Sequence, residues 1–243
     1  MRPIVLGLLL VSICLPALAQ RPQKARDSEA QRILRGYQSR ARVIDELLVE
    51  GEGMKALRRA DRLLNDMSRG FMAGGGTSGY LGTVMVLRAL AAVQVDRKDD
   101  AIWHWQTAVQ LMPAAEKLAM TAYGDAGEFL RGHPPRDAAL SECARQMKCL
   151  PKEGTKPPRR KKRTPIEFPP GMLGQGRKVV VRVETIIGTD GRVREPVILQ
   201  SEGELTMVLA VLRGMRTWEY HPATLDGDPI EVPFVLTANF VSR

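Results

Sequence analysis

The sequence predicts an α+β protein, with α-helical hairpins in its first half and a small antiparallel sheet domain in its second. Apolar residues recur at helical spacing from residue 28 to about residue 140. Further on, valines alternate with other residues over 178–183, as in a strand with one buried face. Asp190-Gly191 follows as a hairpin signal, and a helical run and a last strand complete the order strand–strand–helix–strand.

Length and composition are those of a globular protein with two modest domains. The chain has 243 residues, of which 44% are hydrophobic and 26% are charged. Its net charge is +9, but residues 151–163 alone carry seven Lys or Arg against one Asp or Glu. Residues 164–243 carry eight basic against ten acidic side chains. The basic character therefore belongs to one short segment.

Residues 1–19 have the pattern of a cleavable export signal. A positively charged start precedes an apolar run, and the small-residue site Ala17-Leu18-Ala19 stands before Gln20. The apolar run is short for a membrane span and is interrupted by Pro16. We expect export, with cleavage after Ala19. The alternative is an uncleaved membrane anchor.

Cysteine usage fits an exported chain. Cleavage would remove Cys14 and leave Cys143 and Cys149. An even pair in an oxidising compartment predicts one disulfide that closes a small loop. Two unpaired structural thiols are the alternative.

Residues 20–150 are expected to form the helical domain. The first predicted helix ends at Gly51-Glu52-Gly53, the second ends at Gly70, the third covers 81–95 and the fourth covers 101–112. The last pair resembles a tetratricopeptide repeat, which places small, aromatic and terminating residues as found here at Ala101, Trp105, Ala108 and Pro113.

The cluster Trp103-His104-Trp105 suggests an aromatic ligand cage. Adjacent residues of a helix point in different directions, so the three cannot all line one pocket. We expect Trp105 in the core and Trp103 partly exposed.

Residues 151–164 are predicted to be a linker because they are rich in proline and basic residues. The simplest interpretation is a solvated spacer that separates two domains. A more specific interpretation is that the segment binds anionic lipid or a cell-wall polymer. The export signal argues against nucleic acid as a partner. The basic core comprises Arg159, Arg160, Lys161, Lys162 and Arg163.

The predicted sheet domain covers 165–243. A capping box at 201–204 begins the helix, and an apolar stripe along 205–212 would lie across the sheet. The last strand is expected over 230–240.

At these residues the chain resembles the C-terminal domain of the TonB family, the energy transducers of Gram-negative bacteria. The resemblance covers about 75 residues and implies a periplasmic protein that grips an extended segment of an outer-membrane receptor by strand addition. Family members keep an N-terminal membrane helix and a long proline-rich spacer, whereas here the N-terminal helix looks cleavable and the spacer is short. The matching motifs are Phe168-Pro169, Asp190-Gly191, Ser201 with Gly203, Trp218 with Tyr220 and Pro222-Ala223, Gly227 with Pro229, and Phe240.

The last strand is the expected binding element. Pro233 suits a sheet edge because it has no backbone donor. A partner strand would then pair with Phe234, Val235, Leu236, Thr237 and Ala238. In the alternative, a second copy of the chain or the helical half covers this edge.

Catalytic and metal-binding patterns are not found in the sequence. It has no nucleophile elbow, Gly-rich phosphate loop or CxxC pair. His104, His133 and His221 lie in separate predicted elements. We therefore expect a binding protein without a cofactor, and the resemblance to the TonB family implies that its partner is a protein of the cell envelope. The alternative function is an envelope scaffold that binds cell-wall polymer or anionic lipid through its basic linker.

Overall fold

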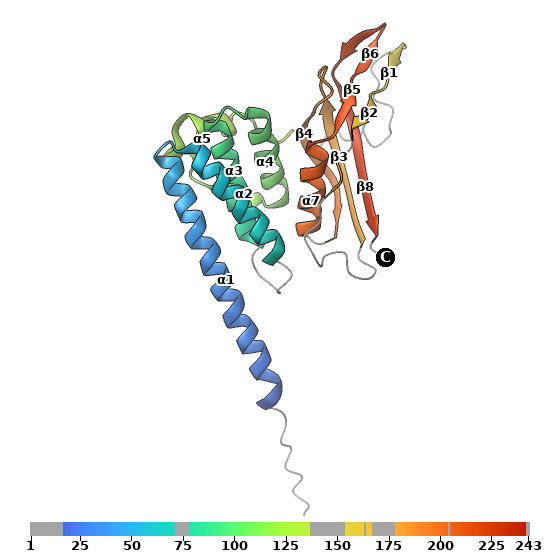
Figure 1. The fold of residues 1–243 in the computed structure, drawn as a ribbon. Coiled ribbons are helices and arrows are strands. Elements are labelled where there is room, and N and C mark those ends of the chain that lie inside the picture. The colour runs from blue at the N-terminus through green and yellow to red at the C-terminus, as the bar shows by residue number, and fades with distance from the viewer. Residues whose placement is uncertain are drawn as a thin grey trace, which may run out of the picture.

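The predicted fold class is confirmed. The computed structural model describes residues 17–70, 78–136, 154–162, 164–166, 178–203 and 205–241. Packed helices occupy the first part of the chain, and antiparallel sheets with one helix occupy the second (Figure 1).

The helical half contains each of the predicted helices. The fourth begins three residues before its predicted start, because Asp99 and Asp100 lie in its first turn, where acidic side chains stabilise a helix. Two 3₁₀ turns, η2 and η3, then lead into a short fifth helix. The elements are α1 (Ala17–Val49), α2 (Gly53–Gly70), α3 (Ser78–Gln94), α4 (Lys98–Leu111), η2 (Pro113–Lys117), η3 (Met120–Tyr123) and α5 (Gly124–Arg131).

Helix α3 is the centre of the helical half. It packs against α1, α2, α4 and α5, and its residues 84–92 are buried on every side. This explains why it is apolar all round. Its buried Arg88 joins three helices, since it pairs with Asp61 of α2 at 2.6 Å and with Asp100 of α4 at 3.1 Å.

The second half is built on a three-stranded antiparallel sheet with the order β4-β3-β8. Helix α7 covers one face, and Val208, Val211, Leu212 and Met215 enter its core with the alternate valines of β3. Two smaller sheets, with the orders β1-β6-β7 and β2-β5, extend from one end (Figure 1). Their strands are β1 (Thr155–Lys156), β2 (Arg159–Lys162), β5 (Glu219–His221), β6 (Ala223–Leu225) and β7 (Asp228–Ile230); the main sheet has β3 (Lys178–Ile187), β4 (Val193–Glu202) and β8 (Val232–Val241), with α7 at Leu205–Arg216.

The predicted hairpin turn joins β3 to β4. Gly191 has a φ of +75°, and its N–H donates to the carbonyl of Gly188 at 2.8 Å. A Cβ atom at this position would collide with the backbone carbonyl of Tyr220 on β5. Glycine is therefore required here both by the turn and by the close approach of β5.

The linker prediction for 151–164 is wrong where the structure describes this segment. Lys156 of β1 lies opposite Thr224 of β6, and Arg159 and Arg160 of β2 lie opposite His221 and Tyr220 of β5. These residues belong to the sheets of the second half. The sequence concealed the strand because all four residues of β2 are exposed and therefore show no alternation.

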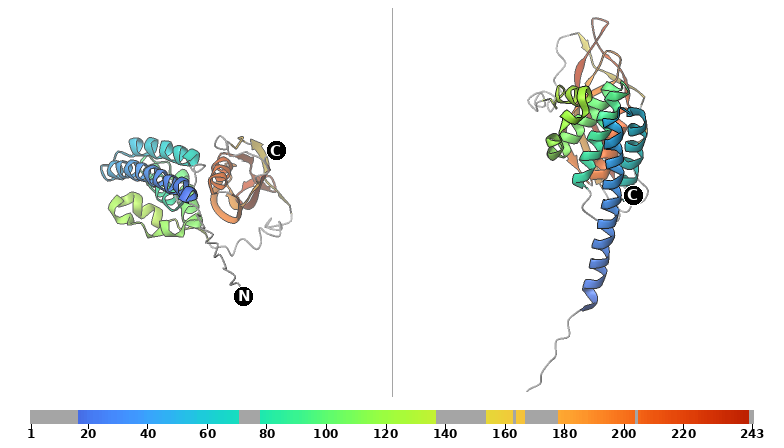
Figure 2. Two further views of the ribbon diagram at one scale, coloured as in Figure 1. Left: turned by 90° about the horizontal axis from the view of Figure 1, so that it is seen from below. Right: turned by 90° about the vertical axis from the view of Figure 1, so that its left-hand side faces the viewer.

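The two halves also pack directly against each other, contrary to the expected separation. Helix α7 lies between the main sheet and the helices, so its Leu209 joins the helical core while Leu212 joins the sheet core (Figures 1 and 2). Trp103 of α4 is only 2% exposed and enters the sheet core, so the prediction of partial exposure is wrong. Among the described helices, none combines the length and apolarity needed to cross a bilayer.

Candidate functional site: the outer edge of the main sheet

Strand β8 forms one edge of the main sheet. Its register with β3 is continuous from Lys178 opposite Val241 to Ile187 opposite Val232. Within the described part of the chain, β3 is the one strand that pairs with β8. Figures 1 and 2 place this edge on the side away from the helices. The expected binding residues, 234–238, all lie within this edge strand.

The position of Pro233 indicates which way the backbone donors of β8 point. Along an antiparallel ladder, successive N–H groups face alternately toward and away from the neighbouring strand. Proline has no N–H and is accommodated where the donor would face away. Because the register has no bulge, the N–H groups of Val235 and Thr237 point the same way as position 233, toward the open side.

The side chains of the edge strand divide between two faces. Leu236 and Ala238 are buried in the core beneath α7, whereas Thr237 is exposed and Val235 is half-buried. Phe234 makes an edge-to-face contact with Tyr220, with ring centroids 5.8 Å apart. The core thus anchors β8 through alternate residues.

The opposite edge, β4, is occupied by the helical half. The Gln110 side chain on α4 donates from Nε2 to the Pro196 carbonyl at 2.6 Å and accepts from the Ile198 N–H at 2.8 Å. One amide therefore satisfies two backbone groups that a neighbouring strand would otherwise pair. This contact leaves β8 as the edge to which a strand could be added.

A bulge in β4 provides a second contact with the helical half. The register with β3 shifts between Glu184 and Ile186, and Glu195 has a φ of +49°. Arg136, just beyond α5, donates to the Glu195 carbonyl at 3.0 Å and pairs with the Glu184 carboxylate at 3.1 Å. Glu184 is fully buried, so this cation compensates a charge in the interior.

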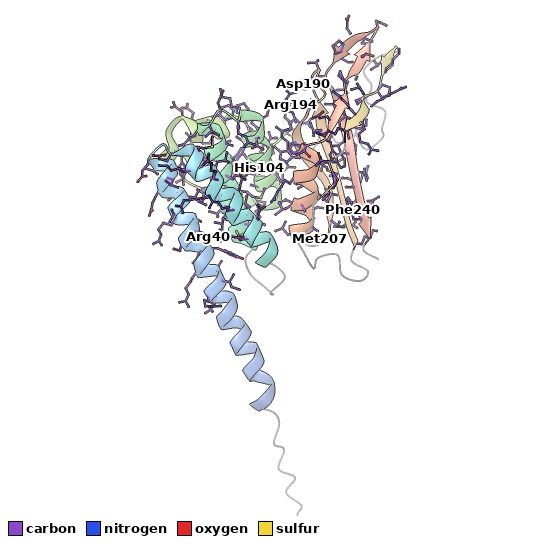
Figure 3. The ribbon with its side chains drawn as sticks, viewed as in Figure 1. Arg40, His104, Asp190, Arg194, Met207 and Phe240 are labelled. Carbon is purple, nitrogen blue, oxygen red and sulfur yellow. The ribbon has the colours of Figure 1, made fainter. Side chains whose placement is uncertain are left out.

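The end of the β3–β4 hairpin meets the start of α4. Arg194 donates to Asp190 at 2.7 Å and to Asp99 of α4 at 3.2 Å. Figure 3 shows Asp190 and Arg194 together at this end of the sheet, beside the helical half. Burial alone would raise the pKa of Asp190, but its hydrogen bond to Arg194 contributes to holding that pKa below its usual value.

The other residues singled out in the sequence do not form a common site. Arg159, Arg160, Lys161 and Lys162 are exposed on β2, while Arg163 lies outside the described residues. Cys143 and Cys149 also lie outside them, so the disulfide stays a prediction. The export signal at 1–19 stays one too, since residues 1–16 lie outside the described part of the chain.

The three histidines lie on different elements. His104 is buried on α4 with Nδ1 at 2.9 Å from the Asp100 carbonyl, His133 follows α5, and His221 is exposed on β5. Within the described ranges, no group of three or more His, Cys, Asp or Glu could hold a metal ion.

Sequence reasoning missed the residues through which the helical half contacts the β4 edge of the sheet. Gln110 and Arg136 contact the sheet across long sequence separations, and a single polar residue in a helix or loop gives no local signal for such contacts. The burial of Trp103 opposite Trp105 could have been suspected. Residues two apart on a helix face opposite sides, so two apolar residues at this spacing indicate a helix covered on both sides.

The second part of the chain is thus a small antiparallel sheet domain with β8 at its outer edge, packed against the helical half. Residues 164–241 match the family model described as Gram-negative bacterial TonB protein C-terminal. Residues 164–241 are therefore a TonB C-terminal domain. The match gives no support to the tetratricopeptide resemblance of the helical half. No curated protein matches the chain.

The family assignment has functional consequences for the domain. TonB C-terminal domains belong to non-enzymatic transducers in the periplasm of Gram-negative bacteria, and the assignment implies interaction with outer-membrane TonB-dependent receptors. It says nothing of which segment of this chain makes the contact.

Proposed function

We propose that residues 234–238 bind an extended segment of an outer-membrane receptor, which adds a strand to the main sheet. The asymmetry of the two sheet edges carries this proposal. Gln110 and Arg136 occupy the backbone of β4, whereas in the described part of the chain β8 pairs with β3 alone. An edge with unpaired donors and acceptors is the template that strand addition uses.

Affinity and selectivity would come from different groups. Backbone hydrogen bonds to the outward-facing groups of Val235 and Thr237 would supply affinity. Alternate side chains next to them would discriminate between receptor segments. Pro233 removes one donor and shortens the usable ladder, so we expect modest affinity.

The decisive variant is Val235→Pro, which removes one outward donor, and its matched control is Val235→Thr, which keeps that donor and a β-branched side chain. Binding of a synthetic receptor plug peptide is measured by isothermal titration calorimetry, and stability by thermal unfolding. We expect Val235→Pro to lose binding with little change in Tm, while Val235→Thr binds like the parent. Equal binding by Val235→Pro would exclude strand addition at this edge.

A second copy of the chain is the competing occupant of the edge. Sedimentation velocity distinguishes the two, because a dimer formed through β8 would dissociate in Val235→Pro without any receptor peptide. A parent protein that is monomeric and binds the peptide supports the proposal.

A scaffold role is a second candidate, favoured by the exposure of all four basic side chains on β2. Pairing with β5 holds these cations on a folded ribbon, where they could bind anionic lipid or a cell-wall polymer. Replacing Arg159, Arg160 and Lys161 with Gln should abolish retention on anionic vesicles or cell-wall sacculi. In the parent, retention should weaken steeply with salt. Unchanged retention in the variant would remove this candidate.

We also propose export by the signal at 1–19, on the basis of the Ala17-Leu18-Ala19 site. N-terminal sequencing of the exported protein should then begin at Gln20. A product that retains Met1 would instead indicate an anchored protein.

A further inference from the structure

A large charged cavity lies where the helical half meets the sheet domain. Its volume is about 890 Å³, within the range of small-molecule sites. Residues 96–100 at the start of α4 form one wall. Lys162 of β2, Arg192 of the hairpin and Arg216 of α7 belong to the others. The walls thus come from both halves of the protein.

Most of the carboxylates in these walls are already neutralised. Three of the four have a cationic partner within 4 Å. The fourth, Glu219, makes no ion pair with the residues that the structure describes, and Lys162, opposite it in the β2–β5 ladder, makes none either. The pairs are Asp96 with Lys98 at 3.6 Å, Asp99 with Arg194 at 3.2 Å, and Asp100 with Arg97 at 2.9 Å. Asp100 has a further partner in Arg88, which lies outside the cavity wall. The negative charge is therefore largely committed to the protein's own cations.

Arg216 stands apart from these pairs. It lies in the last turn of α7, and its Nε is buried without a hydrogen-bond partner among the described residues. Burial lowers the pKa of Arg216, and the more distant Asp100 and Asp99 only partly compensate. Within the described residues no carboxylate pairs with this half-buried guanidinium, so a bound anion would supply the partner that such groups usually have.

We propose that this cavity binds a small anion carrying a carboxylate or phosphate group, with Arg216 as the anchor and Lys162 as a second cation. The planar fork of a guanidinium matches two oxygens of either group, which gives both strength and orientation. The charged walls would disfavour an apolar ligand, because its entry would desolvate ionised groups without replacing their hydrogen bonds.

Binding in this cavity should stabilise the packed arrangement of the two halves. The wall residues 96–100 and Arg216 come from different halves, so the complete site exists only when the halves are together. A ligand that binds only this state raises the unfolding temperature in proportion to the logarithm of its concentration.

The test uses inorganic phosphate and citrate as separate probes on the full chain, at constant ionic strength set with sodium chloride. Binding is measured by calorimetry, thermal shift and the ¹⁵N–¹H signals of arginine Nε groups. We expect saturable binding of at least one probe, with a shifted Arg216 Nε signal. Preference for phosphate or for citrate identifies which oxyanion the site takes. Absence of saturable binding by both probes would overturn the proposal.

Three variants then locate the site. Arg216→Gln should weaken binding about tenfold or more, since it removes the charged fork. Lys162→Gln should weaken it several-fold. The control Lys178→Gln removes an exposed cation of β3 that does not line the cavity, and should bind like the parent. If Arg216→Gln fails to fold, Lys162→Gln still decides, because this residue is exposed. Unchanged binding in either cavity variant would overturn the proposal.

Discussion

The side-chain amide of Gln110 hydrogen-bonds the backbone of β4 as a neighbouring strand would. Its Oε1 accepts from the N–H of Ile198 at 2.8 Å, and its Nε2 donates to the carbonyl of Pro196 at 2.6 Å. Through this one residue, helix α4 occupies part of the β4 edge of the main sheet. This contact makes the two edges of the main sheet unequal, and the proposed binding function depends on that inequality.

Replacing Gln110 with Ala should expose the edge of β4. Two hydrogen bonds to β4 and one to the Gln106 carbonyl are lost, so the free energy of unfolding should fall by about 2 kcal/mol. Hydrogen exchange at the Ile198 amide should accelerate more than at neighbouring amides. The control is Gln200→Ala, which removes a half-buried glutamine of the same strand that donates to Glu202 and not to the helical half. Unchanged protection of Ile198 would show that the bond contributes nothing in solution.

The two halves should unfold together. Trp103 and Leu209 each enter a core on the other side of the boundary, so neither half keeps its core when the other is lost. Circular dichroism at 222 nm and near-ultraviolet circular dichroism should give one coincident transition. Trp103→Ala should lower the free energy of unfolding by about 3–5 kcal/mol. Two separate transitions in the parent would restore the picture of two independent domains.

Acid should destabilise the protein through His104. Burial, followed by the positive charge of Arg88, lowers the pKa of His104 from 6.5 to about 3. The unfolded state therefore binds a proton that the folded state does not, and stability falls as the pH drops from about 6.5 to about 3. The contribution approaches 1.4 kcal/mol per pH unit for one proton. In His104→Gln, denaturant titrations over this range should show a smaller slope than in the parent, and an equal slope would contradict the assignment.

The parts of the fold that the sequence predicted are those with a strong local period. The valine alternation of β3, the apolar stripe of α7 and the Asp190-Gly191 turn each encode their own structure, and all three are found. Pro233 likewise indicated an edge strand, because the missing donor is a property of the residue itself.

The parts of the structure that were not predicted depend on contacts between segments far apart in the sequence. The sequence of residues 159–162 predicted a spacer, because a strand that is exposed on both faces has the composition of a linker. Its pairing with β5, some 60 residues further along the chain, depends on the fold of the whole domain. The position of Arg216 at the cavity wall could not be predicted from the sequence either, since many helices end with basic residues.

The ion pair between Arg136 and Glu184 gives the sharpest test of how the halves are joined. Glu184 is fully buried on β3, and Arg136 beyond α5 is 15% exposed with its Nη1 at 3.1 Å from the carboxylate. Arg136→Gln leaves an uncompensated charge in the interior, so it should lower the free energy of unfolding by about 3 kcal/mol or more in denaturant titrations. The control is Arg194→Gln, whose ion pairs with Asp99 and Asp190 are exposed and should cost about 1 kcal/mol or less.

The double variant separates the charge from the packing. If the cost of Arg136→Gln comes from the isolated carboxylate, adding Glu184→Gln should recover most of it, because a neutral amide can be buried with far less penalty. Some loss should remain, since Arg136 also donates to the Glu195 carbonyl at 3.0 Å and pairs with its carboxylate at 3.2 Å. A double variant as unstable as the sum of the two single variants would mean that the residues act independently. The ion pair would then not be what holds this part of the helical half to the sheet.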